Sequence, residues 1–274
     1  MVGFKILKKI EFSDQTFLWE VDAPEIARAV EPGHFVIVRP DVIGERVPLT
    51  VADFDKDKGT ITMVIQAVGK STKMMQQMPE GEEISDIVGP LGQATVIEEA
   101  KKVVLVGGGL GVAPVFPQLR AYKEAGSQTI SIIGFRTKDL IFWEDKFQQF
   151  SDSLHIATDD GSYGHKGFVT NVLRKVLEEN PDVDHIVAVG PLVMMKACSE
   201  LANEFDKSIT VSLNPIMVDG TGMCGGCRVT VGGEQKFACV DGPEFDGRFV
   251  NFDELLNRAQ RFRTEEVSST QQYE

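Results

Sequence analysis

Residues 102–114 read Lys102-Val-Val-Leu-Val-Gly-Gly-Gly-Leu-Gly-Val-Ala-Pro114, an apolar run that leads directly into a glycine-rich turn. The run predicts a buried strand, and the proline suits the first turn of a helix. A strand, a glycine turn without side chains and a helix N-terminus together let the backbone of the turn approach a pyrophosphate. The strict G-x-G-x-x-G fingerprint is absent, and no acidic residue closes the next strand. The stretch therefore predicts an α/β nucleotide-binding unit without choosing between NAD and NADP.

The chain around this stretch alternates apolar strands with helical patterns. Predicted strands at 102–106, 129–135, 154–158 and 185–189 are interleaved with predicted helices at 114–125, 141–150, 167–179 and 192–205. Such alternation is typical of a parallel sheet with helices on both faces. Arg136, Asp160 and Gly190 follow three of the strands, at the edge where open α/β sheets bind ligands. Each of these turns, taken singly, is equally well read as an ordinary connection.

The first hundred residues have a different texture. Short β-type runs at 17–21, 34–39 and 60–68 are separated by turn residues, which predicts a small antiparallel barrel. Helical character is confined to residues 70–77. The segment Arg46-Val-Pro-Leu-Thr50 follows a turn and offers a cation and a hydroxyl to a phosphate or a flavin edge.

The strongest chemical signal is Asp219-Gly-Thr-Gly-Met-Cys224-Gly-Gly-Cys227, followed by Cys239. The spacing reproduces the C-x4-C-x2-C ligation of plant-type [2Fe–2S] clusters, with aspartate in the first place. A carboxylate is anionic and can bind iron. The interleaved glycines let a loop wrap a cluster while its N–H groups point at the sulfurs.

Other readings of these cysteines remain open. Zinc also binds closely spaced cysteines, but zinc sites usually contain two C-x2-C pairs, and this chain has one. A cluster is therefore favoured over a structural zinc site. Cys198 lies alone in a helical pattern and is expected to be a small buried hydrophobe. The segment 211–262 is too small to be stabilised by its own core, so we expect a metal centre to hold it.

Composition sets the broad class. The 274 residues are 42% hydrophobic, and 28 basic against 41 acidic residues give a formal charge of −13. Such a surface repels phosphate backbones, so nucleic acid is not an expected partner. Neither a membrane span nor a signal peptide is apparent, and we expect a cytoplasmic protein that does not act on membranes.

The order of these motifs resembles the ferredoxin–NADP reductase superfamily, in its branch with a C-terminal [2Fe–2S] cluster. Arg46-x-Pro48-x-Thr50, then Val68-Gly-Lys-Ser-Thr72, then Gly107 to Pro114 and finally the cysteines carry the resemblance over nearly the whole chain. It implies an FAD-binding β-barrel domain at 1–98, an NAD(P)-binding α/β domain at 99–210, a [2Fe–2S] module at 211–262 and a flexible tail at 263–274.

The resemblance also implies the cofactors FAD, [2Fe–2S] and NAD(H), and assigns residues to each. The implied flavin set is Arg46, Val47, Pro48, Leu49, Thr50, Gln66, Val68, Gly69, Lys70, Ser71 and Thr72. The implied nicotinamide set is Gly108, Gly109, Leu110, Gly111, Ala113, Pro114, Arg136, Asp160 and Gly190. The implied metal ligands are Asp219, Cys224, Cys227 and Cys239. Hydride transfer to a flavin needs no general acid or base, and none is assigned.

Two kinds of protein in this branch are relevant. The electron-transfer subunit of dihydroorotate dehydrogenase B has four Cys ligands, whereas the small subunit of the electron-bifurcating NADH-dependent reduced ferredoxin:NADP+ oxidoreductase resembles this chain in having Asp first. Asp219 favours the second, an oxidoreductase subunit whose large partner in a heterodimer carries a flavin and [4Fe–4S] clusters. The first remains the alternative. A zinc-stabilised, nicotinamide-sensing regulatory module is the alternative from another class.

Overall fold

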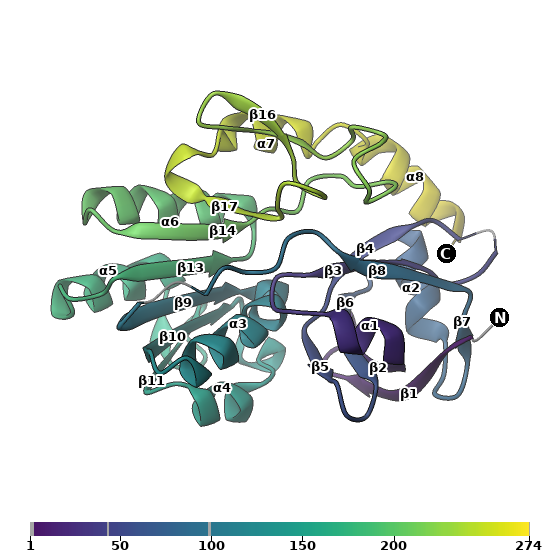
Figure 1. Ribbon diagram of the computed structural model, residues 1–274, viewed down its shortest axis with the longest axis horizontal. Coiled ribbons are helices and arrows are strands. Elements are labelled where there is room, and N and C mark those ends of the chain that lie inside the picture. Colours follow the sequence, from purple (N-terminus) through teal and green to yellow (C-terminus); the bar gives the residue numbers. More distant parts are fainter. Residues whose placement is uncertain (1–2, 43, 98–99, 274) are drawn as a thin grey trace.

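The computed structural model describes residues 3–42, 44–97 and 100–273, and it has three parts (Figure 1). A strand-rich N-terminal part lies beside a sheet flanked by helices, and a C-terminal part lies along both of them. The predicted boundary at 98/99 falls on residues outside the described ones. No helix within the described ranges is long and apolar enough to cross a bilayer.

The N-terminal part consists of two antiparallel sheets around a common core. Their strand orders are β5-β6-β2-β1-β7 and β4-β3-β8. The elements are β1 (Phe4–Glu11), β2 (Thr16–Asp22), α1 (Pro24–Ala29), β3 (Phe35–Arg39), β4 (Val47–Thr50), β5 (Asp53–Asp55), β6 (Thr60–Gln66), α2 (Lys70–Gln77), β7 (Glu83–Ile84) and β8 (Asp86–Leu91). Phe17, Trp19 and Val21 of β2 are fully buried in this core, because alternate residues of a strand share a face. The predicted antiparallel barrel is confirmed.

The outward faces of two barrel strands bury side chains against the other parts. Leu18 of β2 lies in the core of the α/β part, whereas its neighbours on the strand point into the barrel. Phe35 and Ile37 of β3 lie in a core that includes the cysteine-bearing segment, and Val36 points into the barrel. The three parts therefore share apolar cores, and the barrel is held against both of its neighbours.

The α/β part is a seven-stranded sheet with the order β12-β11-β10-β9-β13-β14-β17. Its strands are β9 (Lys102–Gly108), β10 (Gln128–Phe135), β11 (Ser153–Thr158), β12 (His165–Lys166), β13 (His185–Val189), β14 (Ser208–Ser212) and β17 (Glu244–Asp246). Its helices are η1 (Gly109–Gly111), α3 (Val112–Glu124), η2 (Lys138–Leu140), α4 (Glu144–Phe150), α5 (Val169–Glu179) and α6 (Leu192–Glu204). On β9, Val103 and Leu105 face one core and Val104 and Val106 the other, which confirms the parallel sheet buried on both faces.

The C-terminal part contains the hairpin of β15 (Arg228–Val231) and β16 (Glu234–Phe237), then η3 (Gly247–Phe249), α7 (Phe252–Arg258) and α8 (Arg263–Tyr273). Its strand β17 extends the parallel sheet by pairing antiparallel with β14, and Cys227 and Cys239 lie in the same core as α6. Packing on the sheet thus supports this part, in addition to any metal. The predicted boundary at 210 falls inside β14, so the domain limits remain predictions.

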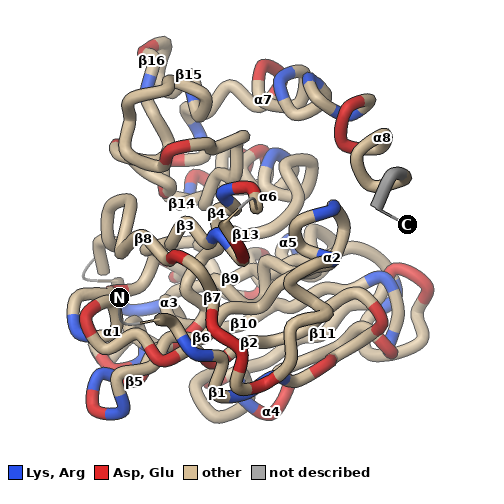
Figure 2. Tube along the Cα trace, turned by 90° about the vertical axis from the view of Figure 1, so that its right-hand side faces the viewer, with Lys and Arg blue, Asp and Glu red and all other residues tan. Residues whose placement is uncertain are grey.

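Residues 263–273, for which the sequence predicted a flexible tail, form helix α8. The segment is rich in Glu and Gln, which are good helix formers, and α8 contacts α2 of the barrel. Acidic and basic residues occur in all three parts of the trace (Figure 2).

A charged contact joins the barrel to the sheet. The Asp53 carboxylate accepts hydrogen bonds from Arg120 Nη1 of α3 at 2.6 Å and from Lys146 Nζ of α4 at 2.5 Å. The Arg120 guanidinium also lies 4.9 Å from the centroid of the Phe54 ring. The Asp53 side chain is 19% exposed, so solvent screens this pair less than it screens a surface ion pair.

Asp53→Asn is expected to lower the free energy of unfolding by about 1–2 kcal/mol, because two cations lose their shared anion in a partly buried place. Thermal unfolding measures the effect. Glu25→Gln, which breaks an exposed pair with Arg28, is the control and is expected to change little. Equal melting temperatures for the two variants would contradict a stabilising role for Asp53.

Candidate nucleotide and metal sites

The glycine-rich turn lies at the carboxyl edge of the sheet, between β9 and α3. Gly109 has a φ of +55°, and a Cβ there would meet no atom within 4 Å, so the backbone is open to a ligand. Gly111 has a different role, because a Cβ on it would lie 2.2 Å from the Val189 carbonyl oxygen of β13. The predicted strand, turn and helix are therefore confirmed, with one glycine open to solvent and the other needed for close packing.

The other predicted nicotinamide residues lie along the same edge. Gly190 follows β13, and a Cβ on it or on Gly108 would collide with the Met194 side chain. Arg136 follows β10 and its carbonyl accepts from the Asp160 N–H at 3.3 Å, so these two loops are adjacent. Hydrogen bonds from the Ser162 hydroxyl and N–H hold the pKa of Asp160 below its ordinary value, and this carboxylate is thus anionic.

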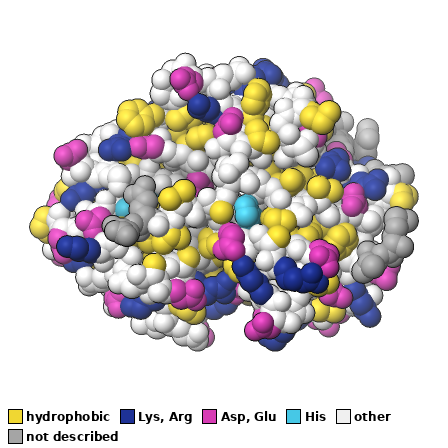
Figure 3. Space-filling model, viewed as in Figure 1, with side chains coloured by type: hydrophobic (Ala, Val, Ile, Leu, Met, Phe, Trp, Pro, Cys, Tyr) yellow, Lys and Arg dark blue, Asp and Glu magenta, His cyan; other side chains and the backbone are white. Residues whose placement is uncertain are grey.

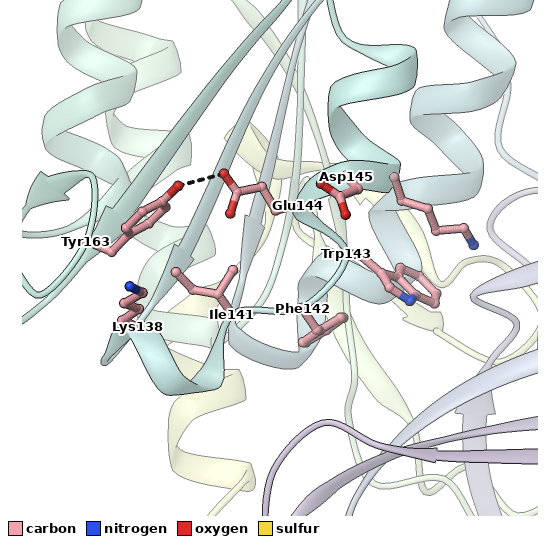
Figure 4. A pocket seen from close by; sticks show the side chains of 8 residues that line it. Lys138, Ile141, Phe142, Trp143, Glu144, Asp145 and Tyr163 are labelled. Atoms are coloured by element: carbon pink, nitrogen blue, oxygen red, sulfur yellow. Dashed lines mark hydrogen bonds between the residues drawn. The ribbon is translucent and has the colours of Figure 1, made fainter.

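A cleft of about 600 Å³ adjoins these loops, and sequence reasoning missed it (Figure 4). Its lining residues are Lys138, Ile141, Phe142, Trp143, Glu144, Asp145, Lys146 and Tyr163. The Tyr163 hydroxyl donates to Glu144 at 2.9 Å, which raises the pKa of Tyr163. Figure 4 shows these two side chains meeting, with Lys138 beside the Tyr163 ring.

The backbone at Trp143 explains why the cleft was missed. Its φ of +61° lies in the left-handed region, which is rare for a bulky residue. The sequence predicts a helix from Ile141, but this conformation delays the start of α4 to Glu144. Residues 141–143 therefore form part of the cleft wall instead of a helical turn, and no residue type in the sequence signals it.

The predicted flavin residues lie on β4 and at the start of α2. Val47, Pro48, Leu49 and Thr50 form β4 and are all partly exposed. Gln66 ends β6, and Gly69 precedes α2 with open space where a Cβ would lie. Thr72 Oγ1 accepts from the N–H groups of Val68 and Gly69 at 3.1 Å, and the Ser71 hydroxyl donates to the Glu45 carboxylate. The N-terminus of α2 and the partly exposed strand β4 together suit a phosphate-bearing cofactor.

Arg46 is the exception in this set. Its Nε donates to the Val218 carbonyl and its Nη2 to the Asp219 carbonyl, both at 3.2 Å. A residue predicted to contact flavin thus contacts the loop that carries the first predicted metal ligand. The structure brings the flavin set and the metal set into direct contact through one side chain.

The four predicted metal ligands form two pairs. Asp219 Oδ1 and Cys224 Sγ lie 3.3 Å apart, and the Sγ atoms of Cys227 and Cys239 lie 3.2 Å apart. The first pair is near the surface, where Cys224 is exposed, whereas Cys227 and Cys239 are 1% and 2% exposed. Within the described residues, no three His, Cys, Asp or Glu side chains form a group that could surround one metal ion. Two pairs suit a cluster of two irons, each iron taking one pair.

The backbone of the loop that carries the ligands directs N–H groups at the ligand sulfur atoms. Gly220, Gly222 and Gly225 have φ values of +75°, +86° and +65°, which only glycine adopts freely. The N–H of Gly226 points at Cys224 Sγ at 3.4 Å, and the N–H of Cys239 at Cys227 Sγ at 3.5 Å. These contacts provide the N–H···S bonds expected around a cluster.

The protonation of the ligands also fits a cationic cofactor. Burial opposes ionisation of Asp219, but hydrogen bonds from Cys224 and Thr221 outweigh it and lower the pKa of Asp219 to about 2. Burial and the neighbouring Cys227 thiol raise the pKa of Cys239 to about 12. A metal must therefore displace the proton of Cys239, as thiolate ligation requires. Cys198 is confirmed as a fully buried side chain.

Residues 214–251 match the iron–sulfur cluster binding domain of dihydroorotate dehydrogenase B, and residues 105–200 match the oxidoreductase NAD-binding domain. A dihydroorotate dehydrogenase B (NAD(+)) electron transfer subunit homologue from Thermotoga maritima is 47% identical over 269 residues, which cover 98% of this chain and 95% of that protein. The chain belongs to the dihydroorotate dehydrogenase B electron-transfer subunit family. It is an electron-transfer subunit of the oxidoreductase class.

Solved structures extend the comparison for this family member. One from a study of flavin-based electron bifurcation, that of an NADH-dependent reduced ferredoxin-NADP oxidoreductase, is 45% identical with a TM-score of 0.94 and covers 100% of this chain and 98% of the other. A ferredoxin NADP+ reductase from Neisseria gonorrhoeae covers 74% of this chain and 91% of the other, with a TM-score of 0.62 and 15% identity, which shows the fold alone. The predicted ferredoxin–NADP reductase-like fold and the NAD-binding and iron–sulfur domains are confirmed.

The family member also contains a buried carboxyl that sequence reasoning missed. Glu244 Oε1, on β17, accepts hydrogen bonds from Gln118 Nε2 of α3 at 2.7 Å and from Thr95 Oγ1 at 2.9 Å. Burial raises the pKa of Glu244 to about 7, against a smaller opposing effect of the bond from Thr95. No cation in the described part of the chain makes an ion pair with it.

Glu244→Gln is expected to flatten the pH dependence of stability. The folded carboxyl holds its proton up to about pH 7, whereas the unfolded one ionises near its ordinary value of 4.5. Folding is therefore favoured at low pH, and this contribution, on the order of 3 kcal/mol, is lost as pH rises from 4.5 through 7. Thermal unfolding at pH 5 and pH 8 measures it. Identical pH profiles for wild type and Gln variant would exclude Glu244 as the titrating group.

Proposed function

We propose that this chain exchanges hydride between NAD(H) and a bound FAD, and exchanges single electrons with a [2Fe–2S] cluster held by Asp219, Cys224, Cys227 and Cys239. The observation that supports it most strongly is the arrangement of one carboxylate and three thiols as two pairs, 3.3 and 3.2 Å apart, in a loop whose N–H groups point at sulfur. A single-ion site would instead bring all four ligands around one point.

The chain's own residues would divide the work between three places. The open backbone at Gly109 and the N-terminus of α3 would bind the coenzyme pyrophosphate, which places the nicotinamide at the carboxyl edge of the sheet. Strand β4 and the N-terminus of α2 would bind and orient the flavin. A flavin is needed because a nicotinamide gives two electrons as hydride, whereas an iron–sulfur cluster takes them singly.

The assembly we propose is a heterodimer in the cytoplasm, with a large subunit that carries a flavin and [4Fe–4S] clusters. In it, this chain would be the small subunit of an electron-bifurcating NADH-dependent reduced ferredoxin:NADP+ oxidoreductase. Asp219 in the place of the first cysteine supports this choice, as does 45% identity over the whole chain to a solved structure of that enzyme. Thiolate ligands suit the reducing cytoplasm.

A second candidate is electron transfer to a dihydroorotate dehydrogenase, which the family relationship favours. Adding NADH and the chain to each kind of partner subunit distinguishes the two. We expect NADH-dependent reduction of the subunit that carries [4Fe–4S] clusters. Turnover with a dihydroorotate dehydrogenase catalytic subunit, without reduction of the [4Fe–4S] subunit, would instead support the second candidate.

Metal and flavin analysis of anaerobically purified protein tests the cofactor set. We expect about two irons, two acid-labile sulfides and one FAD per chain. One zinc per chain without flavin would instead support a nicotinamide-sensing module and would exclude electron transfer as the function.

A further inference from the structure

We propose that Arg46 is a positioning residue that holds the Asp219–Cys224 side of the cluster site against the barrel. The proposal rests on the function proposed above, because it concerns how the loop 218–224 is held when a cluster is bound. It assigns Arg46 a role besides any contact with flavin. The role is to fix the place of the Asp219–Cys224 pair relative to strand β4.

The first observation is the bonding of the guanidinium. Two of its nitrogens donate to the consecutive carbonyls of Val218 and Asp219, each at 3.2 Å. A planar guanidinium presents its donors in a rigid fork, so two such bonds set direction as well as distance. A lysine ammonium retains the charge but cannot reproduce this geometry.

The second observation is the close approach of the same loop to the barrel sheet. A Cβ on Gly220 would lie 2.9 Å from Ile37 Cγ1 of β3 and 3.0 Å from Leu91 Cδ1 of β8. The loop backbone therefore lies directly on two barrel strands, next to the residue that Arg46 holds. Figure 3 shows apolar side chains across the middle of the face on which the three parts meet.

The third observation is that the Asp219 carboxylate is hydrogen-bonded to its own loop. Asp219 accepts from the N–H groups of Thr221 at 3.2 Å and of Met223 and Cys224 at 3.0 Å. Loop and ligand thus form one unit, which Arg46 and the contact under Gly220 attach to the barrel. The inner pair needs no such attachment, because Cys227 and Cys239 are buried in the apolar core.

The consequence is that Arg46 connects the barrel directly to the loop that carries Asp219 and Cys224. Arg46 immediately precedes β4, the strand assigned to flavin binding, and its side chain ends on the ligand loop. Because the potential and spectrum of a cluster depend on hydrogen bonding and exposure around its ligands, releasing this loop should alter both. We expect the change in spectrum and potential to come from loss of the two directed hydrogen bonds of the guanidinium, and not from loss of positive charge alone.

The test compares Arg46→Lys and Arg46→Ala with wild type after chemical reduction, which does not depend on flavin or NADH. We expect both variants to retain iron, and both to show a changed paramagnetic resonance spectrum and a shifted cluster midpoint potential. Arg28→Lys, an exposed barrel arginine paired with Glu25, is the control and is expected to match wild type. Flavin content, measured on the same samples, reports the separate contact with flavin.

Gly220→Ala disturbs the loop from its other side without touching Arg46. We expect a changed spectrum with unchanged flavin content. The proposal is overturned if both Arg46 variants keep the wild-type spectrum and potential, whatever their flavin content. It is also overturned if only Arg46→Ala differs, since charge alone would then account for the effect. Wild-type protein without iron would instead contradict the proposed function.

Discussion

Cys227→Ser is expected to remove iron from the protein almost completely. Cys227 is 1% exposed, and its sulfur lies 3.2 Å from that of Cys239, with which it would hold the inner iron. A serine hydroxyl stays protonated at neutral pH and leaves that iron with one protein ligand. Changes that affect only the surroundings of a ligand typically cost 10–100-fold in metal affinity, so loss of the ligand itself should exceed about 100-fold.

Iron analysis and visible absorption measure this effect. Cys198→Ser is the matched control, because Cys198 is also fully buried but lies on α6 and is not one of the predicted ligands. We expect it to retain iron and to lose only about 1–3 kcal/mol of stability from burying a hydroxyl. Full iron content in Cys227→Ser would show that the metal, if any, is bound elsewhere.

Gly111→Ala is expected to damage both stability and coenzyme binding. The added Cβ would lie 2.2 Å from the Val189 carbonyl oxygen and 2.6 Å from its carbon. These are backbone atoms of β13, so no side-chain rotation relieves the contact and the start of α3 must move away from the sheet. Overpacking of this kind costs about 3 kcal/mol, and displacement of the turn should weaken NADH binding at least about tenfold.

Gly126→Ala is the comparison, because it introduces backbone strain without a steric clash. Gly126 follows the other end of α3, has a φ of +90°, and has no atom within 4 Å of its would-be Cβ. It should cost about 1 kcal/mol and leave NADH affinity unchanged. Thermal unfolding and NADH titration measure both variants, and equal effects would show that the contact with Val189 is unimportant.

The elements that the sequence predicted well are those fixed by local periodicity. Residues 103–106 are all apolar, and a strand buried on both faces is the structure that satisfies this pattern. The cysteine loop was also predictable, because ligand spacing and glycine placement are local. Asp219 and Cys224 meet within a loop of six residues, which requires no knowledge of the rest of the fold.

The features that were missed depend on contacts between distant segments. Strand β17 is three residues long and pairs with β14 about thirty residues earlier, so no local pattern reveals it. Glu244 is buried only because that pairing places it under α3 and Thr95. The sequence likewise indicated a cation at Arg46 but not its target, since Val218 lies 172 residues away. Trp143 adopts a left-handed conformation that its residue type disfavours, which made the start of α4 unpredictable.

The central claim is that NADH reduces this chain through a flavin and that the electrons reach a two-iron cluster on its C-terminal part. Anaerobic titration of the purified subunit with NADH, followed by visible absorption and paramagnetic resonance, tests it most directly. We predict bleaching of the flavin absorption and, after one-electron reduction, the signal of a reduced [2Fe–2S] cluster. Iron-free, colourless protein that NADH leaves unchanged after anaerobic reconstitution would contradict the account.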